Sequence, residues 1–158
     1  MTILEVGTIA PEFELQNQAG DNVRLSDYLG KQIVLYFFPR ADTPGCIVEA
    51  CEFRDDHRLY VDREAVIIGV SHDNVQDEAK FIKKYNLPFT LLADSNHAVS
   101  ELYGVWVEKK FFGREFMGIK RTTYIIDKQG IIESVFEKVS PKGHSKEVLE
   151  KLNGEFAA

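Results

Sequence analysis

The two cysteines of the sequence, Cys46 and Cys51, stand near the start of one predicted helix. A β-rich apolar run ends at Pro39, and Thr43 and Pro44 are typical of the N-cap and first residue of a helix. Cys46 then falls in the first turn, where free backbone N–H groups and the positive end of the helix dipole favour a thiolate over a thiol. Because the thiolate is the nucleophilic form, Cys46 is the candidate nucleophile.

Cys51 is predicted to have a different role, because it lies more than one helical turn further along, where no free N–H groups remain. In an intact helix, residues five apart have Cα atoms ~8.5 Å apart, whereas a disulfide needs less than about 7 Å. A Cys46–Cys51 bridge therefore requires the first turn to unwind, which would couple oxidation to a local conformational change. The spacing also differs from the Cys-x-x-Cys of thioredoxin-type proteins.

Two other interpretations of the cysteines remain open. Both could be small apolar side chains of a buried helix, which is a common environment for a free cysteine. Cys-x4-Cys also falls within the spacing of zinc ligands. The four histidines, however, are scattered along the sequence, at His57, His72, His97 and His144, and form no His-x3–5-His pair.

A wider pattern surrounds the cysteines. Pro39-x-x-x-Thr43-x-x-Cys46 resembles the peroxidatic signature of the peroxiredoxins, and Cys46-x4-Cys51 resembles their bacterioferritin comigratory protein (peroxiredoxin Q) group. Because 103–119 and 121–127 are also similar to this group, the resemblance extends over most of the chain. It implies a thiol-dependent peroxidase that acts on hydrogen peroxide and organic hydroperoxides, with no cofactor and no metal.

The resemblance also implies roles for individual residues. Cys46 would be the peroxidatic cysteine, Thr43 a hydroxyl that orients the peroxide, Pro39 a pocket wall and Arg121 the guanidinium beside the thiolate. Negative charge moves along the O–O axis during attack, so fixed donors such as the five-donor fork of arginine would stabilise it. Glu49 would orient Arg121, and the alternative is that Glu49 is an exposed helix residue.

The resemblance further implies that the sulfenic acid formed on Cys46 condenses with Cys51 and that thioredoxin reduces the resulting disulfide. Ile47 departs from the group pattern, since threonine is common at this position. Two alternatives remain: a thioredoxin-like disulfide oxidoreductase, and a redox-switched binding protein that uses the bridge as a sensor. Thr43 and Arg121 discriminate among these, because a disulfide oxidoreductase needs neither a peroxide-orienting hydroxyl nor a guanidinium at the nucleophile. A sensor, in turn, needs no fast repeated reduction.

Composition places the chain among ordinary soluble proteins. With 158 residues, 44% hydrophobic and 28% charged, residues 1–158 are expected to form a single domain. The net charge of −6 argues against nucleic acid and anionic membranes as partners. Because the sequence has no leader pattern and no membrane-spanning apolar run, we expect a cytoplasmic protein. We also expect a monomer.

Hydrophobic periodicity predicts alternating strands and helices. The pattern favours a thioredoxin-like α/β fold with a central mixed sheet flanked by helices and an N-terminal β-hairpin. The predicted elements are a hairpin over 13–15 and 23–25, strands at 33–38, 65–71, 89–92, 122–126 and 131–136, and helices at 44–61, 75–85, 98–102 and 145–152. His72 is interpreted as solvated. Four aromatic residues are interpreted as core or pocket walls: Trp106, Phe111, Phe112 and Phe116.

Overall fold

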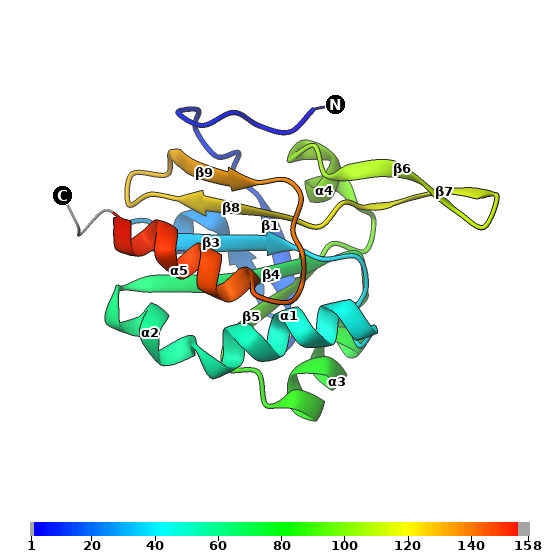
Figure 1. Cartoon of the computed structure of the whole chain (residues 1–158), viewed down its shortest axis with the longest axis horizontal. Coiled ribbons are helices and arrows are strands. Elements are labelled where there is room, and N and C mark those ends of the chain that lie inside the picture. Colours follow the sequence, from blue (N-terminus) through cyan, green and yellow to red (C-terminus); the bar gives the residue numbers. More distant parts are fainter. Residues whose placement is uncertain (1, 155–158) are drawn as a thin grey trace.

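A seven-stranded mixed sheet forms the centre of the molecule, with strand order β2-β1-β5-β4-β3-β8-β9. The computed structural model describes the backbone of residues 2–154 (Figure 1). The strands of this sheet are β1 (Glu14–Asn17), β2 (Asn22–Arg24), β3 (Gln32–Phe37), β4 (Ala65–Ser71), β5 (Thr90–Ala93), β8 (Thr122–Ile126) and β9 (Ile132–Phe136). Strands β3, β4 and β5 are parallel, whereas the β1–β2 and β8–β9 pairs are antiparallel. The predicted mixed sheet and N-terminal hairpin are thus confirmed.

Helices cover both faces of this sheet (Figure 1). They are α1 (Pro44–Asp55), α2 (His57–Asp62), α3 (Val75–Tyr85), α4 (Ala98–Leu102) and α5 (His144–Gly154), with a 3-10 turn η1 (Leu25–Tyr28). On one face, buried side chains of α1, α3 and α5 form one hydrophobic cluster with β3 and β4. On the other face, α4 and the N-terminal segment complete a second cluster. Burial on both faces explains why β3 reads as a continuous apolar run.

Strand pairing brings two distant segments to one edge of the sheet. β3 runs toward Pro39 and α1, and it pairs antiparallel with β8 in the register Phe37 to Thr122. The residue just before β8, Arg121, therefore lies at the edge where α1 begins. Helix α1 and Arg121 are brought together by the sheet, although 75 positions separate Arg121 from Cys46.

The predicted helix from Pro44 to Val61 is wrong in one respect, because the chain forms two helices here. Asp56 interrupts them with φ −94° and ψ 2°. Its carboxylate accepts a hydrogen bond of 2.8 Å from the Ser145 hydroxyl, and the Tyr60 hydroxyl donates to the Ser145 carbonyl at 2.9 Å. Contacts with α5 thus stabilise the break, which periodicity within the segment did not indicate. The predicted bounds of β4, α3 and α4 are confirmed.

A second hairpin, β6 (Trp106–Phe111) and β7 (Arg114–Ile119), was not predicted and projects from the body of the protein (Figure 1). Its turn consists of Phe112 and Gly113, both with positive φ, at 51° and 74°. Such turns usually carry Asn-Gly, so Phe-Gly gave no hairpin signal.

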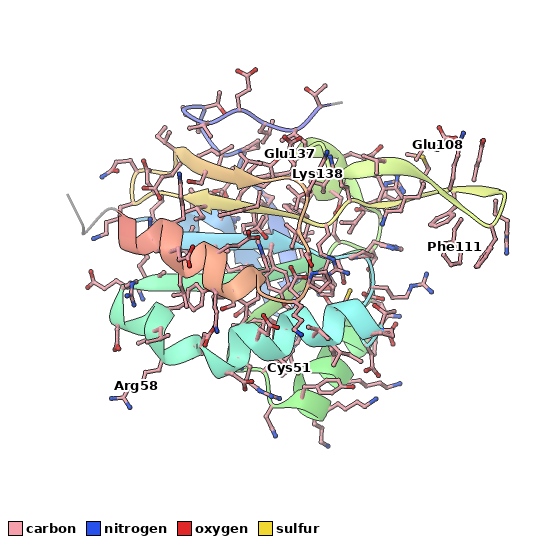
Figure 2. All side chains as sticks on the ribbon, viewed as in Figure 1. Cys51, Arg58, Glu108, Phe111, Glu137 and Lys138 are labelled. Atoms are coloured by element: carbon pink, nitrogen blue, oxygen red, sulfur yellow. The ribbon has the colours of Figure 1, made fainter. Side chains whose placement is uncertain are left out.

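The aromatic side chains of this hairpin correct two interpretations. Phe111 and Phe112 are 63% and 90% exposed, and Phe116 is exposed as well, so these three are not core residues. Figure 2 shows Phe111 on the projecting hairpin. Trp106 is half-buried and stacks on His97 with a centroid distance of 4.1 Å. His72 packs edge-on against the same indole at 5.2 Å and is half-buried rather than solvated.

Candidate active site

Cys46 occupies the third position of α1, in the first turn as predicted. Thr43 is at the N-cap position and Pro44 is the first helical residue. The Thr43 side chain does not cap the helix, because its hydroxyl donates to the Arg40 carbonyl at 2.8 Å. Cys46 is only 2% exposed and lies at the positive end of the helix.

Arg121 bridges the cysteine sulfur and a buried carboxylate. Its Nη2 lies 3.5 Å from Cys46 Sγ, and its Nη1 donates to Glu49 Oε1 at 2.6 Å. The Arg121 side chain is only 16% exposed, so the guanidinium is held in one orientation beside the sulfur. Glu49 is buried, which excludes the alternative of an exposed helix glutamate.

The electrostatics of this ion pair reflect its burial. Burial raises the pKa of Glu49 to about 7, although the Arg121 charge and hydrogen bond oppose the rise. Burial alone would lower the pKa of Arg121, but Glu49 and Cys46 raise it above its usual value. The guanidinium therefore stays charged and favours negative charge on the adjacent sulfur.

Lys109 adds a cation to the site, although the sequence favoured a solvated surface position for the Lys109-Lys110 pair. It lies on β6, half-buried, and burial lowers its pKa, with Arg121 contributing to the fall and Cys46 opposing it. These interactions place the lysine near both groups. Because the β6–β7 hairpin was not predicted, no local signal connected this residue with the cysteine.

Cys51 lies further along the same uninterrupted helix and is half-buried (Figure 2). Burial raises its pKa, with Arg54 opposing this effect. Both cysteines are free, and Cys51 keeps its proton, consistent with a thiol that reacts only after Cys46 has been oxidised. A bond between the two sulfurs requires α1 to open near its start.

Gly45 lies beside the guanidinium, and Pro39 follows the buried run of β3. Pro39 is half-buried directly after the last buried residue of the β3 run. At Gly45, a Cβ atom would lie 3.1 Å from Arg121 Nη2 and 3.3 Å from Pro141 Cγ. Because Gly45 has no side chain, the space beside it is open for Arg121 to reach the Cys46 sulfur.

Replacing Gly45 by alanine is expected to displace Arg121 and slow the reaction of Cys46 with peroxide by about tenfold. Alanine is a better helix former than glycine by ~1 kcal/mol, so the thermal unfolding midpoint should not fall. Stopped-flow kinetics and a thermal melt of the same variant separate these effects. An unchanged rate would show that the guanidinium tolerates the added methyl group.

Within the described residues, no group of three or more His, Cys, Asp or Glu side chains is arranged to hold a metal ion. The helices of the described region include none that is long and apolar enough to cross a membrane.

Comparison with known proteins gives matches over almost the whole chain. The sequence profile of the AhpC/TSA family matches residues 6–135. Peroxiredoxin Bcp of Bacillus subtilis is 51% identical over 152 residues, covering 96% of both chains. Peroxiredoxin Bcp of Escherichia coli is 41% identical over 152 residues, covering 96% of this chain and 97% of the relative.

Solved structures agree with these sequence matches. A cysteine-to-serine mutant of Xylella fastidiosa PrxQ superposes with a TM-score of 0.93 at 29% identity, covering 99% of each chain. BcpB of Mycobacterium tuberculosis gives a TM-score of 0.85 at 34% identity, covering 96% of this chain and 97% of the other. The Xanthomonas campestris bacterioferritin comigratory protein, described for its alkyl peroxide reduction activity, gives a TM-score of 0.87 at 29% identity. The match covers 98% of this chain and 99% of the other.

The chain therefore belongs to the AhpC/TSA family of thioredoxin-fold peroxiredoxins. Within that family its relatives are the Bcp and PrxQ proteins, which makes it a thiol-dependent peroxidase of the atypical two-cysteine type. The predicted family, fold and enzyme class are confirmed.

Proposed function

We propose that Cys46 is the peroxidatic cysteine, that Cys51 resolves it, and that Arg121, Thr43 and Pro39 complete the peroxide site, with Glu49 orienting the arginine. The observation that carries this proposal is the contact of Arg121 Nη2 with Cys46 Sγ, 3.5 Å apart in the first turn of α1. A guanidinium in this position favours the thiolate and can donate hydrogen bonds to the peroxide oxygens as negative charge develops on them.

In the proposed first step, the Cys46 thiolate attacks one peroxide oxygen. An S–O bond forms, the O–O bond breaks, and the other oxygen leaves as hydroxide or alkoxide and takes up a proton. Sulfur is oxidised to sulfenic acid, and the peroxide is reduced to water or an alcohol. The Arg121 fork and free N–H groups of α1 would stabilise the departing negative charge.

Thr43 would orient the peroxide as an acceptor. Its own proton is directed at the Arg40 carbonyl at 2.8 Å, which leaves the lone pairs of Oγ1 to accept the O–H of the substrate. This arrangement differs from a hydroxyl that donates to the peroxide, and it aligns the oxygen that sulfur attacks.

In the second step, the Cys51 thiol attacks the sulfenic acid, water leaves, and a Cys46–Cys51 disulfide forms. Because the cysteines share one continuous helix, the first turn of α1 would unwind before this bond can form. A thioredoxin-type dithiol would then reduce the disulfide by thiol–disulfide exchange.

The substrate range proposed is hydrogen peroxide and organic hydroperoxides. Alkyl peroxide reduction is ascribed to the Xanthomonas campestris relative. We further propose a single domain over residues 1–158 that acts as a cytoplasmic monomer, without nucleic-acid or membrane partners, as its net charge of −6 favours. Analytical ultracentrifugation of the reduced and oxidised protein tests whether the protein is a monomer in each state.

Thr43 provides a direct test of the peroxide site. Thr43→Val should slow the reaction of the reduced protein with hydrogen peroxide by about tenfold to a hundredfold, because the acceptor oxygen is lost at constant side-chain volume. Thr43→Ser keeps the hydroxyl and should retain most of the rate in the same stopped-flow assay. Equal rates in the valine and serine variants would contradict the proposed role.

A further inference from the structure

The loop between β3 and α1 is fixed to the rest of the protein just before Cys46. The backbone N–H of Ala41, in this loop, donates to Asp73 Oδ2 at 2.7 Å, and Asp73 lies in the turn between β4 and α3. The same carboxylate oxygen accepts from the Ser71 hydroxyl at 2.6 Å. Because Ser71 is fully buried at the end of β4, it holds Asp73 in the orientation in which the carboxylate binds the loop. Hydrogen bonds to a charged acceptor are among the stronger ones that a backbone N–H makes.

The next residue of the loop, Asp42, makes a second attachment. Its Oδ2 lies 2.9 Å from Lys84 Nζ, and its Oδ1 accepts from the Tyr85 hydroxyl at 3.0 Å. Lys84 and Tyr85 are the last two residues of α3. Since Asp73 precedes α3 and this pair ends it, two consecutive loop residues are held from the two ends of one helix.

The backbone of Asp42 is strained, with φ 61°. Residues other than glycine adopt this left-handed conformation at a cost in free energy, which is smaller for Asp and Asn, and surrounding contacts must impose it. At Asp42 those contacts are the bonds to Lys84 and Tyr85. The left-handed residue leads directly into Thr43 and α1, so its conformation belongs to the state in which the first turn of α1 is formed.

Both attachments are continuous with that first turn. Thr43 is the N-cap residue, and its carbonyl accepts from the Ile47 N–H at 2.8 Å. Ile47 packs, together with Ala41, against the same hydrophobic cluster as Tyr85. An opening of the turn therefore releases Thr43, and with it the constraint that keeps Asp42 left-handed.

The part of α1 beyond Cys51 is fixed by other contacts. Glu52 Oε1 accepts from the Gly143 N–H at 2.8 Å, and the Arg54 guanidinium donates to a carbonyl at the end of α3, also at 2.8 Å. Because these contacts lie after Cys51, they need not break when the preceding segment opens. It is therefore Cys46 and the turn around it that move.

We propose that Asp73 and Asp42 are positioning residues: their contacts with the loop and with α3 hold the first turn of α1 closed around Cys46, and these contacts break when the turn opens. This role rests on the peroxidatic and resolving functions proposed above for the two cysteines. The two carboxylates would thereby set how long the oxidised Cys46 stays in the closed site before Cys51 can reach it.

The sulfenic acid of Cys46 has two fates in this scheme. With the turn open, the Cys51 sulfur attacks, an S–S bond forms, the S–O bond breaks, and the hydroxyl leaves as water with the Cys51 proton. With the turn closed, the sulfur attacks a second peroxide instead: another S–O bond forms and the O–O bond breaks. Sulfur is then oxidised to sulfinic acid, and the peroxide is reduced to water or an alcohol. Contacts that favour the closed turn favour this second fate at high peroxide.

The test is the peroxide concentration at which half of the protein ends as sulfinic acid and half as disulfide. It is measured by intact mass after one dose of hydrogen peroxide to the reduced whole protein, without a reductant. Asp73→Ala removes the acceptor of the Ala41 N–H, so the population with an open turn, and with it this half-point, should rise by about tenfold. Asp73→Asn keeps a side-chain oxygen for the N–H and should stay within about twofold of wild type.

Tyr85→Phe tests the Asp42 attachment without a change in the loop. It removes only the hydroxyl, while the ring can still pack against Phe81 at a centroid distance of 5.5 Å, and the half-point should rise by about threefold. Asp42→Gly removes the carboxylate and also accommodates the positive φ. Tyr85→Phe added to Asp42→Gly should cause no further shift, because the hydroxyl acts through the carboxylate. Additive shifts in the double variant would overturn this attachment.

Two matched controls lie far from the cysteines. Asp127→Ala removes a carboxylate that accepts the backbone N–H groups of two nearby residues at 2.9 Å, at the end of β8 opposite Arg121. Glu64→Gly replaces another left-handed residue, with φ 56°, whose carboxylate lies 3.6 Å from Lys128 Nζ. Both should keep the wild-type half-point even where the thermal midpoint changes. A shift of the same size in either control would show that the half-point follows overall stability, and would overturn the positioning role.

Amide hydrogen exchange of residues 47–50 in the reduced protein measures the opening without peroxide. Exchange should quicken by about tenfold in Asp73→Ala and by less in Tyr85→Phe. If it does so while none of the proteins reacts with peroxide, the anchoring contacts stand and the proposed function fails. Unchanged exchange in both variants would overturn the anchoring. Faster exchange with an unchanged half-point in reactive proteins would show that the opening does not limit disulfide formation, and would overturn the positioning role.

Discussion

Arg121→Lys is expected to slow the reaction of Cys46 with hydrogen peroxide by about 10²–10³-fold, the range found when one preorganised donor to a developing oxyanion is removed. The guanidinium contacts Cys46 Sγ at 3.5 Å and Glu49 Oε1 at 2.6 Å through two different nitrogens. A lysine ammonium has one nitrogen and cannot hold both groups in this geometry. Stopped-flow measurement of the pre-reduced protein gives the rate constant directly.

The matched control is Arg24→Lys. Arg24 also pairs with a glutamate, with Nε 2.8 Å from Glu14 Oε1, but on the exposed N-terminal hairpin. This variant should react at the wild-type rate. If Arg121→Lys also reacted at the wild-type rate, the guanidinium would have no role in the chemistry, and a disulfide oxidoreductase or a redox-switched binding protein would become the better account.

Cys51→Ser is expected to react once and then stop. The first oxidation depends on Cys46 and its neighbours, so its rate should be within about twofold of wild type, since the serine changes one atom of a half-buried side chain. Turnover supported by thioredoxin should fall by more than about tenfold, because no disulfide forms for the reductant to attack. Coupled peroxide consumption and intact mass after one equivalent of peroxide measure the two effects.

Small external thiols provide the control for this variant. A thiol that attacks the Cys46 sulfenic acid directly should restore turnover to Cys51→Ser, whereas Cys46→Ser should stay inactive with any reductant. Unimpaired thioredoxin-dependent turnover in Cys51→Ser would show that resolution does not need Cys51.

Much of this site was accessible from sequence because its determinants are local. Thr43, Pro44 and Cys46 lie within one turn, and the rules for helix starts placed the cysteine in the first turn, where the structure has it. The proximity of Arg121 came only from resemblance, since β3–β8 pairing brings it to the sheet edge and no local pattern reports that pairing.

The features that were missed depend on long-range contacts. The break at Asp56 is stabilised by Ser145 of α5, 89 positions away. The β6–β7 hairpin has a Phe-Gly turn that lacks the usual signal, so its exposed phenylalanines were interpreted as core or pocket walls.

The central claim is that Cys46 is tuned for peroxide and that Cys51 resolves it. The most direct measurement is the stopped-flow reaction of pre-reduced wild-type protein and Cys46→Ser with one equivalent of hydrogen peroxide, followed by intact mass. We expect a fast phase and the loss of two hydrogens, as a disulfide requires, in the wild type, and no fast phase in the variant. A slow reaction of equal rate in both proteins would contradict the account.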